Sequence, residues 1–314
     1  MKQKLIVVCG PTASGKTELA VSLAELFDCE IVSADSMQIY KDISIATAKP
    51  TTEEMRRIRH HLVDFLELSE EFSVADYVKL AGKCIEDIAS RGKIPIVCGG
   101  TGLYISSLIN GISFDETCSS TELREELSKL AEEKGGEYLL EMLREFDPES
   151  ADRLHPNNLM RIIRAIEVYK ISGITMTEAN KLSRNESPYE PVMIGLNYSD
   201  RELLYERVNR RVDRMLEKGL LEEARMVLSR EDVATAGQAI GYKEFKAYFD
   251  GEKPLEECVE SVKQDSRRYA KRQLTWFRRD ERINWIYRDR LSEGESEVTL
   301  ASDIIMKSGI SIRH

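Results

Sequence analysis

Eight consecutive residues near the N-terminus have the composition and spacing of a phosphate-binding loop. The pattern G-x-x-x-x-G-K-S/T is matched at every fixed position by Gly10-Pro11-Thr12-Ala13-Ser14-Gly15-Lys16-Thr17. In such a loop the glycines let successive backbone N–H groups converge on phosphate oxygens at the start of a helix. Lys16 adds a mobile positive charge, and the hydroxyl of Thr17 is a ligand for Mg²⁺. We therefore predict that residues 10–17 bind a phosphate or diphosphate.

A single acidic residue, Asp35, follows the second apolar segment of the chain. Nucleotide-hydrolysing enzymes with such a loop hold their metal with an acidic residue after another apolar strand, but here the segment 94–98 runs directly into Gly99-Gly100. The segment 31–33 instead leaves Asp35 at the carboxyl edge of the expected sheet, where ligands of such folds bind. Asp35 is therefore a candidate site residue. The alternative is that its carboxylate only caps a helix or turn.

Residues 99–104, Gly-Gly-Thr-Gly-Leu-Tyr, form a second glycine-rich junction between an expected strand and an expected helix. Beside the phosphate loop, this junction presents further N–H groups and the hydroxyl of Thr101 to the same ligand. A tight turn in which Thr101 is only the N-cap of the helix explains the pattern equally well. The sequence leaves both interpretations open.

The elements that position these residues alternate between strand and helix. Continuous apolar runs at 4–9, 30–33 and 94–98 predict strands that are buried on both faces of a parallel sheet. Apolar residues at helical spacing predict helices at 17–27 and 74–90. This βαβ order predicts an α/β fold, a P-loop-type parallel sheet covered by helices.

The pattern changes after about residue 116, where the chain becomes charged and helical. We expect helices at 122–134, 137–146 and 158–172, then a strand at 192–196, further helices at 200–218, 220–228, 238–249 and 255–277, and a last strand at 283–287. The chain is therefore expected to have three parts. They are the first part of the α/β body (1–115), a helical insertion (116–190) and a mostly helical second part of the body with a basic C-terminal helix (191–314).

Composition excludes several classes of protein. The chain has 314 residues, of which 42% are hydrophobic and 32% charged, unlike a collagenous, disordered or low-complexity protein. Its apolar runs are too short to span a membrane, and that of the N-terminus is too short for a signal peptide. The six cysteines form no C-x-x-C pair and the four histidines are scattered, so we expect reduced thiols and no structural metal. We expect a cytoplasmic protein.

Charge is distributed unevenly along the chain. The net charge is −10, yet residues 263–282 hold eight Lys and Arg against three Asp and Glu. Binding to a polyanion depends on the local field, so the overall charge does not exclude RNA. Basic residues alternate with Tyr269, Trp276 and Phe277, a composition that suits phosphate contacts and stacking. For these three aromatics, however, we favour an amphipathic helix that buries them in the core.

Further segments occur in a fixed order along the chain. After the phosphate loop come Asp35-Ser36-Met37-Gln38-Ile39-Tyr40, Ala46-Thr47-Ala48-Lys49-Pro50, the junction at 99–104, His155-Pro156-Asn157-Asn158, Arg161, Arg164-Ala165-Ile166-Glu167, Ala239-Ile240-Gly241-Tyr242-Lys243-Glu244, Tyr269-Ala270-Lys271-Arg272-Gln273 and Thr275-Trp276-Phe277-Arg278. Together they strongly resemble the tRNA dimethylallyltransferase, or isopentenyltransferase, family over nearly the whole chain. Eukaryotic relatives carry an additional C-terminal zinc finger that is not found here, so we expect the bacterial form.

The resemblance implies transfer of a dimethylallyl group from dimethylallyl diphosphate to N6 of adenosine 37 in tRNA. It implies that the helical insertion clamps the anticodon stem-loop, that Asp35 is the base, that Lys16 and Thr17 take part in catalysis, and that Mg²⁺ is bound at Thr17. The sequence leaves the oligomeric state open, and we take a monomer as the default. The diphosphate would be bound by Gly10, Pro11, Thr12, Ala13, Ser14, Gly15, Lys16, Thr17 and Arg211. RNA contacts are expected at Asp35, Ser36, Met37, Gln38, Thr101, Arg124, Arg161, Arg164, Gln238, Lys271 and Arg272.

The residue types suit this reaction. An adenine amine is a poor nucleophile, so catalysis depends on neutralising the charge of the departing diphosphate. Lys16, the loop amides and Mg²⁺ do this, and Arg207, Arg210 and Arg211 are candidates to assist, although each of them also fits a solvated helix face. Asp35 then removes the amine proton. Gln38 has the amide that pairs with adenine edges, and the target base must leave its stack to reach it.

Three other functions remain open at this point. A small-molecule kinase of the phosphate-loop class would use Asp35 to activate a hydroxyl, and an isopentenyltransferase could act on free AMP or ADP. Neither needs a helical insertion and a basic C-terminal helix. The third alternative is a non-catalytic RNA-binding or nucleotide-switch protein.

Overall fold

The chain forms two compact units. The computed structural model describes residues 2–112, 120–183, 186–233 and 235–311. One unit, here called the body, comprises Met1–Ile109 and Pro188–His314, and the other, here called the helical unit, comprises Asn110–Ser187. The helical unit is thus inserted into the body between two of its elements.

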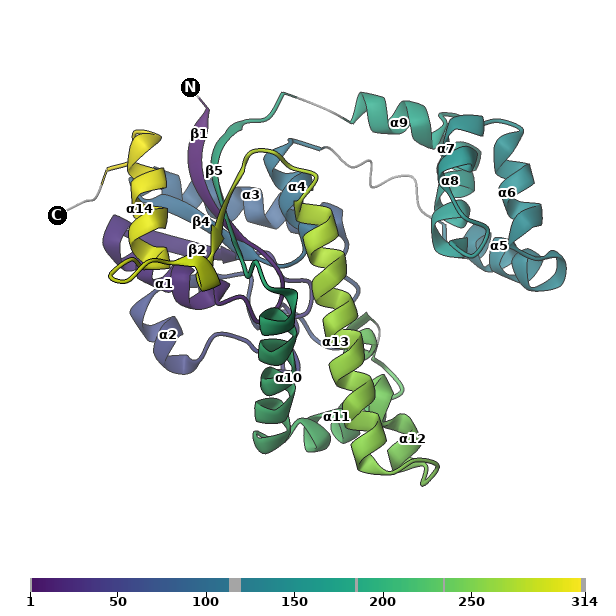
Figure 1. The fold of residues 1–314 in the computed structure, drawn as a ribbon. Helices are drawn as coiled ribbons and strands as arrows, with labels where there is room; N and C mark the ends of the chain where they lie inside the picture. The colour runs from purple at the N-terminus through teal and green to yellow at the C-terminus, as the bar shows by residue number, and fades with distance from the viewer. Residues whose placement is uncertain (1, 113–119, 184–185, 234, 312–314) are drawn as a thin grey trace. The chain divides into compact units, whose positions relative to one another are not determined.

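The centre of the body is a six-stranded parallel sheet (Figure 1). The predicted α/β fold is therefore confirmed. The strand order is β3-β2-β4-β1-β5-β6, so the first strand lies in the middle and pairs with β4 and β5. The strands are β1 (Gln3–Cys9), β2 (Cys29–Ser33), β3 (His60–His61), β4 (Ile94–Gly99), β5 (Tyr189–Asn197) and β6 (Ile283–Tyr287).

Helices cover both faces of the sheet, which explains why the strands are apolar without alternation. On one face Ile6 and Val8 pack in a core with α1 (Lys16–Phe27) and α14 (Glu297–Lys307). On the other face Leu5 and Val7 pack in a core with α3 (Val74–Ser90) and α4 (Gly102–Ile109). Every residue of β1 from Leu5 onward is therefore buried.

A third core forms where the second part of the body meets the segment after β2. Residues Ile39 and Ile43 pack there with side chains of α10 (Arg201–Glu217), α11 (Leu220–Leu228) and α13 (Leu255–Phe277). The predicted helix at 238–249 is wrong, because Gly241 has φ +108°, which a right-handed helix does not allow. In its place are η1 (Thr235–Gln238), η2 (Lys243–Phe245) and α12 (Lys246–Phe249).

The helical unit has its own core of leucine, isoleucine and alanine side chains. The Asp147 carboxylate accepts hydrogen bonds from the N–H of Ser150 and the hydroxyl of Thr177, and so joins two of its helices. Its helices are α5 (Thr121–Lys134), α6 (Gly136–Arg144), α7 (Pro148–Arg153), α8 (Leu159–Ser172) and α9 (Met176–Leu182). The body also contains α2 (Thr52–Arg57) and η3 (Arg288–Arg290).

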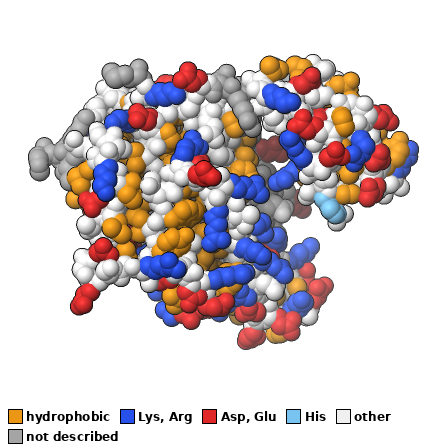
Figure 2. Space-filling model, turned by 45° about the horizontal axis from the view of Figure 1, so that its top comes forward, with side chains coloured by type: hydrophobic (Ala, Val, Ile, Leu, Met, Phe, Trp, Pro, Cys, Tyr) orange, Lys and Arg blue, Asp and Glu red, His pale blue; other side chains and the backbone are white. Residues whose placement is uncertain are grey.

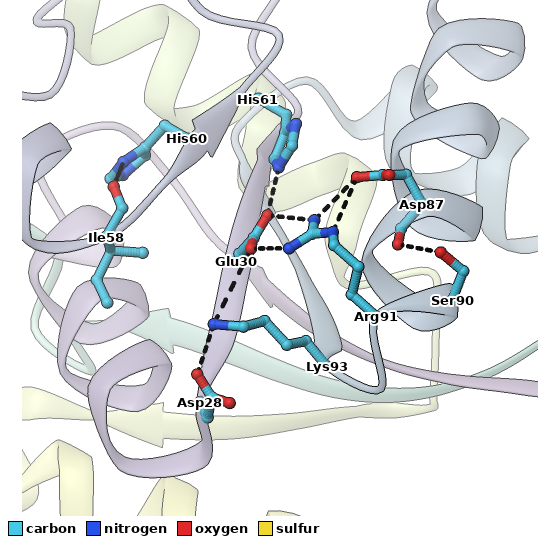
Figure 3. A network of polar contacts seen from close by, with 9 residues as sticks. All are labelled: Asp28, Glu30, Ile58, His60, His61, Asp87, Ser90, Arg91 and Lys93. Carbon is cyan, nitrogen blue, oxygen red and sulfur yellow. Dashed lines mark hydrogen bonds and ion pairs between the residues drawn. The ribbon is translucent and has the colours of Figure 1, made fainter.

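A network of ion pairs fixes the edge of the sheet at β2 and β3 (Figure 3). Glu30 is only 5% exposed, and its carboxylate accepts two hydrogen bonds from the guanidinium of Arg91, one of 2.7 Å. His61 Nε2 lies 2.8 Å from the same carboxylate. The hydrogen bonds from Arg91 chiefly lower the pKa of Glu30, to about 2. The short strand β3 is thereby held in register.

Across the described ranges, no helix combines the length and apolar character needed to cross a membrane. Five cysteines are free thiols, as predicted: Cys9, Cys29, Cys84, Cys98 and Cys258. Cys118 lies outside the described residues.

Candidate active site

The phosphate loop lies between β1 and α1, as the sequence predicts. Its residue Gly15 is the N-cap of α1 in a left-handed conformation, with φ +96°. A Cβ at Gly15 would also lie 2.2 Å from Nη1 of Arg288, so another residue would both strain the backbone and displace this guanidinium. No side chain caps this helix. The N–H groups of its first turn therefore remain available to an anion.

Two residues that are remote in sequence brace the phosphate loop. The side-chain amide of Gln273 accepts a hydrogen bond from the N–H of Thr12 at 2.8 Å and donates one to the carbonyl of Gly100 at 3.0 Å. It thus joins both glycine-rich junctions. Arg288 donates to the carbonyl of Ser14 at 3.3 Å.

A cavity of about 310 Å³ opens beside the loop and collects half of the predicted site residues. Its lining includes Thr12, Lys16, Thr17, Asp35, Ser36, Met37, Gln38, Arg211, Gln238 and Arg272. Arg207 and Arg210 instead line an adjacent cleft of about 770 Å³, which Lys16, Thr17 and Arg211 also border. The other predicted site residues of the body, apart from Lys271, flank this cavity within the two glycine-rich junctions.

The turn that carries Asp35 is fixed by hydrogen bonds. Oδ1 of Asp35 accepts from the N–H of Met37 at 2.9 Å and of Gln38 at 3.4 Å. The N–H of Ser36 donates to the hydroxyl of Thr101 at 3.0 Å. Asp35 is therefore a capping residue, as one interpretation of the sequence required. Its Oδ2 makes no hydrogen bond with another described residue and is left for a ligand in the cavity.

Two cations of the cavity are in an environment that disfavours their charge. Burial lowers the pKa of Lys16 from its ordinary 10.5 to about 8, and Nζ donates to the carbonyl of Pro11 at 2.7 Å. Burial also lowers the pKa of Arg211, an effect that Asp35 opposes. Because a bound diphosphate would compensate both charges, the free site is poised to bind an anion.

Comparisons with known proteins agree over almost the whole chain. A family model described as IPP transferase matches residues 38–280. The tRNA dimethylallyltransferase of Caldanaerobacter subterraneus subsp. tengcongensis is 50% identical over 293 residues, which cover 92% of this chain and 93% of the relative. The chain belongs to the IPP transferase family.

Solved structures of the IPP transferase family have the same fold. The full-length tRNA isopentenylpyrophosphate transferase from Bacillus halodurans is 41% identical, with a TM-score of 0.71, over 98% of this chain and 96% of that chain. A eukaryotic dimethylallyltransferase acting on tRNA is 31% identical, with a TM-score of 0.84, over 99% of this chain and 81% of that chain. The predicted family is therefore confirmed.

The side chain of Gln38 is not free to pair with an adenine edge, contrary to what the sequence led us to expect. Its Nε2 donates to the carbonyls of Thr47 and Ala48 at 3.3 and 3.2 Å, and its Oε1 accepts from the hydroxyl of Ser33 at 3.2 Å. Both N–H groups of the amide are therefore engaged within the protein, and its oxygen already accepts one hydrogen bond. A bidentate contact with adenine would have to replace these hydrogen bonds.

The aromatic residues of α13 are not all in the core, contrary to our interpretation. Phe277 is buried, but Tyr269 lines the cavity and Trp276 is 36% exposed. Burial chiefly raises the pKa of Tyr269, to about 12. The helical face that contains Ala270, Gln273 and Phe277 packs inward, and Trp276 falls on the neighbouring basic face.

The predicted arginines of the helical unit border a hollow of about 950 Å³. Arg124 and Arg164 both donate to Glu167, whose side chain is fully buried. Burial of this carboxyl is outweighed by the hydrogen bonds from Ser120 and the two arginines, so the pKa of Glu167 is below its ordinary value. Arg161 borders the same hollow. The three side chains lie in the helical unit, and the other predicted RNA contacts lie in the body.

Sequence reasoning missed Glu223 of α11. Its carboxylate accepts from the N–H groups of Ser44, Ile45 and Ala46 at 2.8–2.9 Å, and from the hydroxyl of Tyr242 at 2.9 Å. This anchors the segment whose next residues, Thr47 and Ala48, line the cavity. No local pattern marks Glu223, because its partners in this segment are more than 170 positions away.

The donor set fits one mode of magnesium binding. Among the described residues, no group of three His, Cys, Asp or Glu could hold a metal ion. The cavity does contain the hydroxyl of Thr17 and the carboxylate of Asp35. Mg²⁺ commonly keeps several waters and binds through substrate phosphates with one or two protein oxygens. These residues fit a magnesium ion that arrives with a diphosphate.

Proposed function

We propose that this protein transfers a dimethylallyl group from dimethylallyl diphosphate to N6 of adenosine 37 in tRNA and releases diphosphate. One observation carries the proposal: a single cavity is lined by the cations of a phosphate loop and by a carboxylate with an open oxygen. The first half of this arrangement suits the diphosphate, and the second half suits an amine that must lose a proton.

In the reaction, the bond between C1 of the dimethylallyl group and the diphosphate oxygen breaks, and the electron pair leaves with the diphosphate. A new bond forms between C1 and N6. Lys16, Arg211 and the first N–H groups of α1 stabilise the negative charge that develops on the leaving group. The N6 proton is transferred to Oδ2 of Asp35. Bound Mg²⁺, held at Thr17, would supply further charge neutralisation at the diphosphate.

Recognition of RNA is proposed for two sets of residues. Around the cavity we propose Asp35, Ser36, Met37, Gln38, Thr101, Gln238, Lys271 and Arg272, and in the helical unit Arg124, Arg161 and Arg164. The hollow of the helical unit supports this assignment because all three of these arginines border it and a buried carboxylate orients two of them. We propose that the helical unit clamps the anticodon stem-loop.

We also propose that the protein acts as a monomer in the cytoplasm. The residues assigned to the reaction, Lys16, Thr17, Asp35 and Arg211, line a single cavity of the body, which supports a site that needs no second copy.

The activity is tested by incubating the protein with dimethylallyl diphosphate or with ATP, with and without tRNA. The nucleosides of the product are then analysed by mass. We expect a dimethylallyl adduct on adenosine only when dimethylallyl diphosphate and tRNA are both present. Phosphate transfer from ATP, or prenylation of free AMP or ADP in preference to tRNA, would refute the proposal.

The role of Asp35 is tested by the variant Asp35→Asn. The asparagine Oδ1 still accepts from the N–H of Met37, so the turn is preserved and only the base is lost. We expect single-turnover prenylation to fall by about 10²–10⁴-fold with substrate affinities near those of the parent. A metal-binding Asp35 would instead give a variant that added Mg²⁺ partly restores. Parental turnover by Asp35→Asn would exclude the general-base role.

A further inference from the structure

A hollow on the surface of α13 takes no part in the bond breaking or proton transfer above, although two of its lining residues, Lys271 and Arg272, are among the proposed RNA contacts. Its volume is about 460 Å³, and it is here called the α13 hollow. Five of its six lining residues lie in α13 and recur at intervals of three and four, so they share one side of the helix, and the sixth, Arg279, lies just beyond its C-terminal end. The six are Arg268, Lys271, Arg272, Thr275, Trp276 and Arg279. This lining contains four cations, one indole and no carboxylate.

The indole of Trp276 is held in place and yet accessible. It is 36% exposed, although the next residue, Phe277, is buried in the core. Its inner edge rests on the first residue of α4, where a Cβ on Gly102 would lie 2.2 Å from Cδ1 of Trp276. Only glycine allows this contact. The ring is therefore fixed against the backbone on one side and open to the hollow on the other.

The charges around the indole are only partly compensated. Arg268 pairs with Asp265 at 3.0 Å, and the guanidinium of Arg272 lies 5.6 Å from the ring of Tyr269. Lys271 and Arg279 make no ion pair with another described residue. Figure 2 shows a band of Lys and Arg side chains over the part of the body that contains α10 and α13. An exposed indole among uncompensated cations is the combination that single-stranded nucleic acid binds.

The α13 hollow neighbours the active-site cavity and shares one lining residue with it. Arg272 lines both the hollow and the active-site cavity. Trp276 follows Arg272 by one helical turn, a rise of about 6 Å. When one base of an RNA loop occupies the cavity, a neighbouring nucleotide therefore comes within reach of the indole.

We propose that Trp276 is a stacking platform for an unpaired base of tRNA that neighbours the prenylated adenosine, while Lys271 and Arg279 contact the backbone phosphates. The inference rests on the proposed function and adds a base-binding site to it. Stacking requires no hydrogen-bond pattern, so the platform accepts different bases. Bases within a duplex are already stacked, so only an opened loop can use it.

The proposal is tested by titrating variants with an anticodon stem-loop RNA. Trp276→Ala should weaken binding by roughly 5- to 150-fold, the range that corresponds to about 1–3 kcal/mol for one stacked base. Trp276→Phe keeps an aromatic ring and should restore most of the affinity, whereas Trp276→Leu keeps apolar bulk and should not. The Michaelis constant for dimethylallyl diphosphate should not change in any of them. Leu103→Ala, at an exposed position next to Gly102 in α4, is the matched control and should bind like the parent.

A second measurement observes the stacked ring directly. The chain has two tryptophans, so in Trp285→Phe the fluorescence comes from Trp276 alone. We expect the stem-loop to quench this fluorescence and a fully paired duplex to leave it unchanged. Equal binding by the Phe and Leu variants, or no quenching by a bound stem-loop, would overturn the stacking role. Failure of the parent to prenylate tRNA would instead overturn the proposed function, so the two failures are distinguishable.

Discussion

Lys16 should lower the free energy of unfolding of the ligand-free protein, although the proposed reaction needs it to bind the substrate. Its environment lowers the pKa from 10.5 to about 8, mainly by burial, so the folded state disfavours the ammonium that the unfolded chain carries at pH 7. At about 1.4 kcal/mol per pKa unit this difference corresponds to about 3 kcal/mol. Contact of Lys16 with the open cavity and its hydrogen bond to Pro11 reduce the expected cost to about 1–2 kcal/mol. Lys16→Met should therefore stabilise the ligand-free protein by about that amount.

The pH dependence of this gain has a definite sign. Between pH 8 and 10.5 the folded parent has lost the proton that its unfolded state still holds, so the stability of the parent rises with pH. The advantage of Lys16→Met is therefore fully present below pH 8 and disappears as the pH approaches 10.5. Dimethylallyl diphosphate should reverse the order at pH 7, because only the parent gains stability by binding it.

Urea denaturation followed by tryptophan fluorescence measures this directly. Both tryptophans lie in the body, so the signal reports on the unit that contains Lys16. Lys93→Met is the matched control, because it removes a lysine from a surface ion pair with Asp28 and should change stability by no more than about 1 kcal/mol. A ligand-free Lys16→Met less stable than the parent at pH 7 would refute the reasoning. A gain that persists unchanged above pH 10 would refute it too.

Two further predictions concern polar groups that support the site. Glu30→Gln should lower the free energy of unfolding by about 2 kcal/mol at pH 7, as measured by urea denaturation, because Arg91 loses the more buried of its two carboxylate partners and keeps only Asp87. Since the pKa of Glu30 is lowered to about 2, this stability should vanish as the pH falls from about 4.5 to 2, and persistence of the difference at pH 2 would contradict it. Gln273→Leu leaves the N–H of Thr12 without an acceptor and should raise the Michaelis constant for dimethylallyl diphosphate about tenfold, a loss of about 1.4 kcal/mol. Steady-state kinetics with a parental Michaelis constant would show that this brace has no effect on the loop.

Local patterns predicted most of the fold. The helices at 74–90, 220–228 and 255–277 have the predicted bounds, since their apolar spacing is regular and Gly92, Gly219 and Pro254 stand at or near their ends. The strands of the centre were predictable because burial on both faces makes them continuously apolar. The phosphate loop was predictable because its function depends on eight residues that are adjacent in the sequence.

Elements and contacts that depend on distant residues could not be predicted in this way. The two residues of β3 have no strand pattern of their own and are held by β2 and by the network around Glu30. Gln273 and Thr12 are 261 positions apart in the sequence, and no local pattern near either residue predicts their hydrogen bond. The position of Trp276 was easier to predict from the sequence. Arg268, Arg272 and Trp276 are four residues apart, and this spacing already puts the indole on the basic face of the helix.

The place of β1 in the middle of the sheet has a consequence during protein synthesis. The strand is made first, yet one of its two neighbours, β5, begins only at Tyr189, after the whole helical unit. At about 5–20 residues per second, the ribosome needs roughly 5–20 s to advance from β4 to β5. For that interval the nascent body has an unpaired edge at β1 while the helical unit, with a core of its own, is free to fold. Aggregation during synthesis should therefore be most acute for chains arrested between residues 110 and 188.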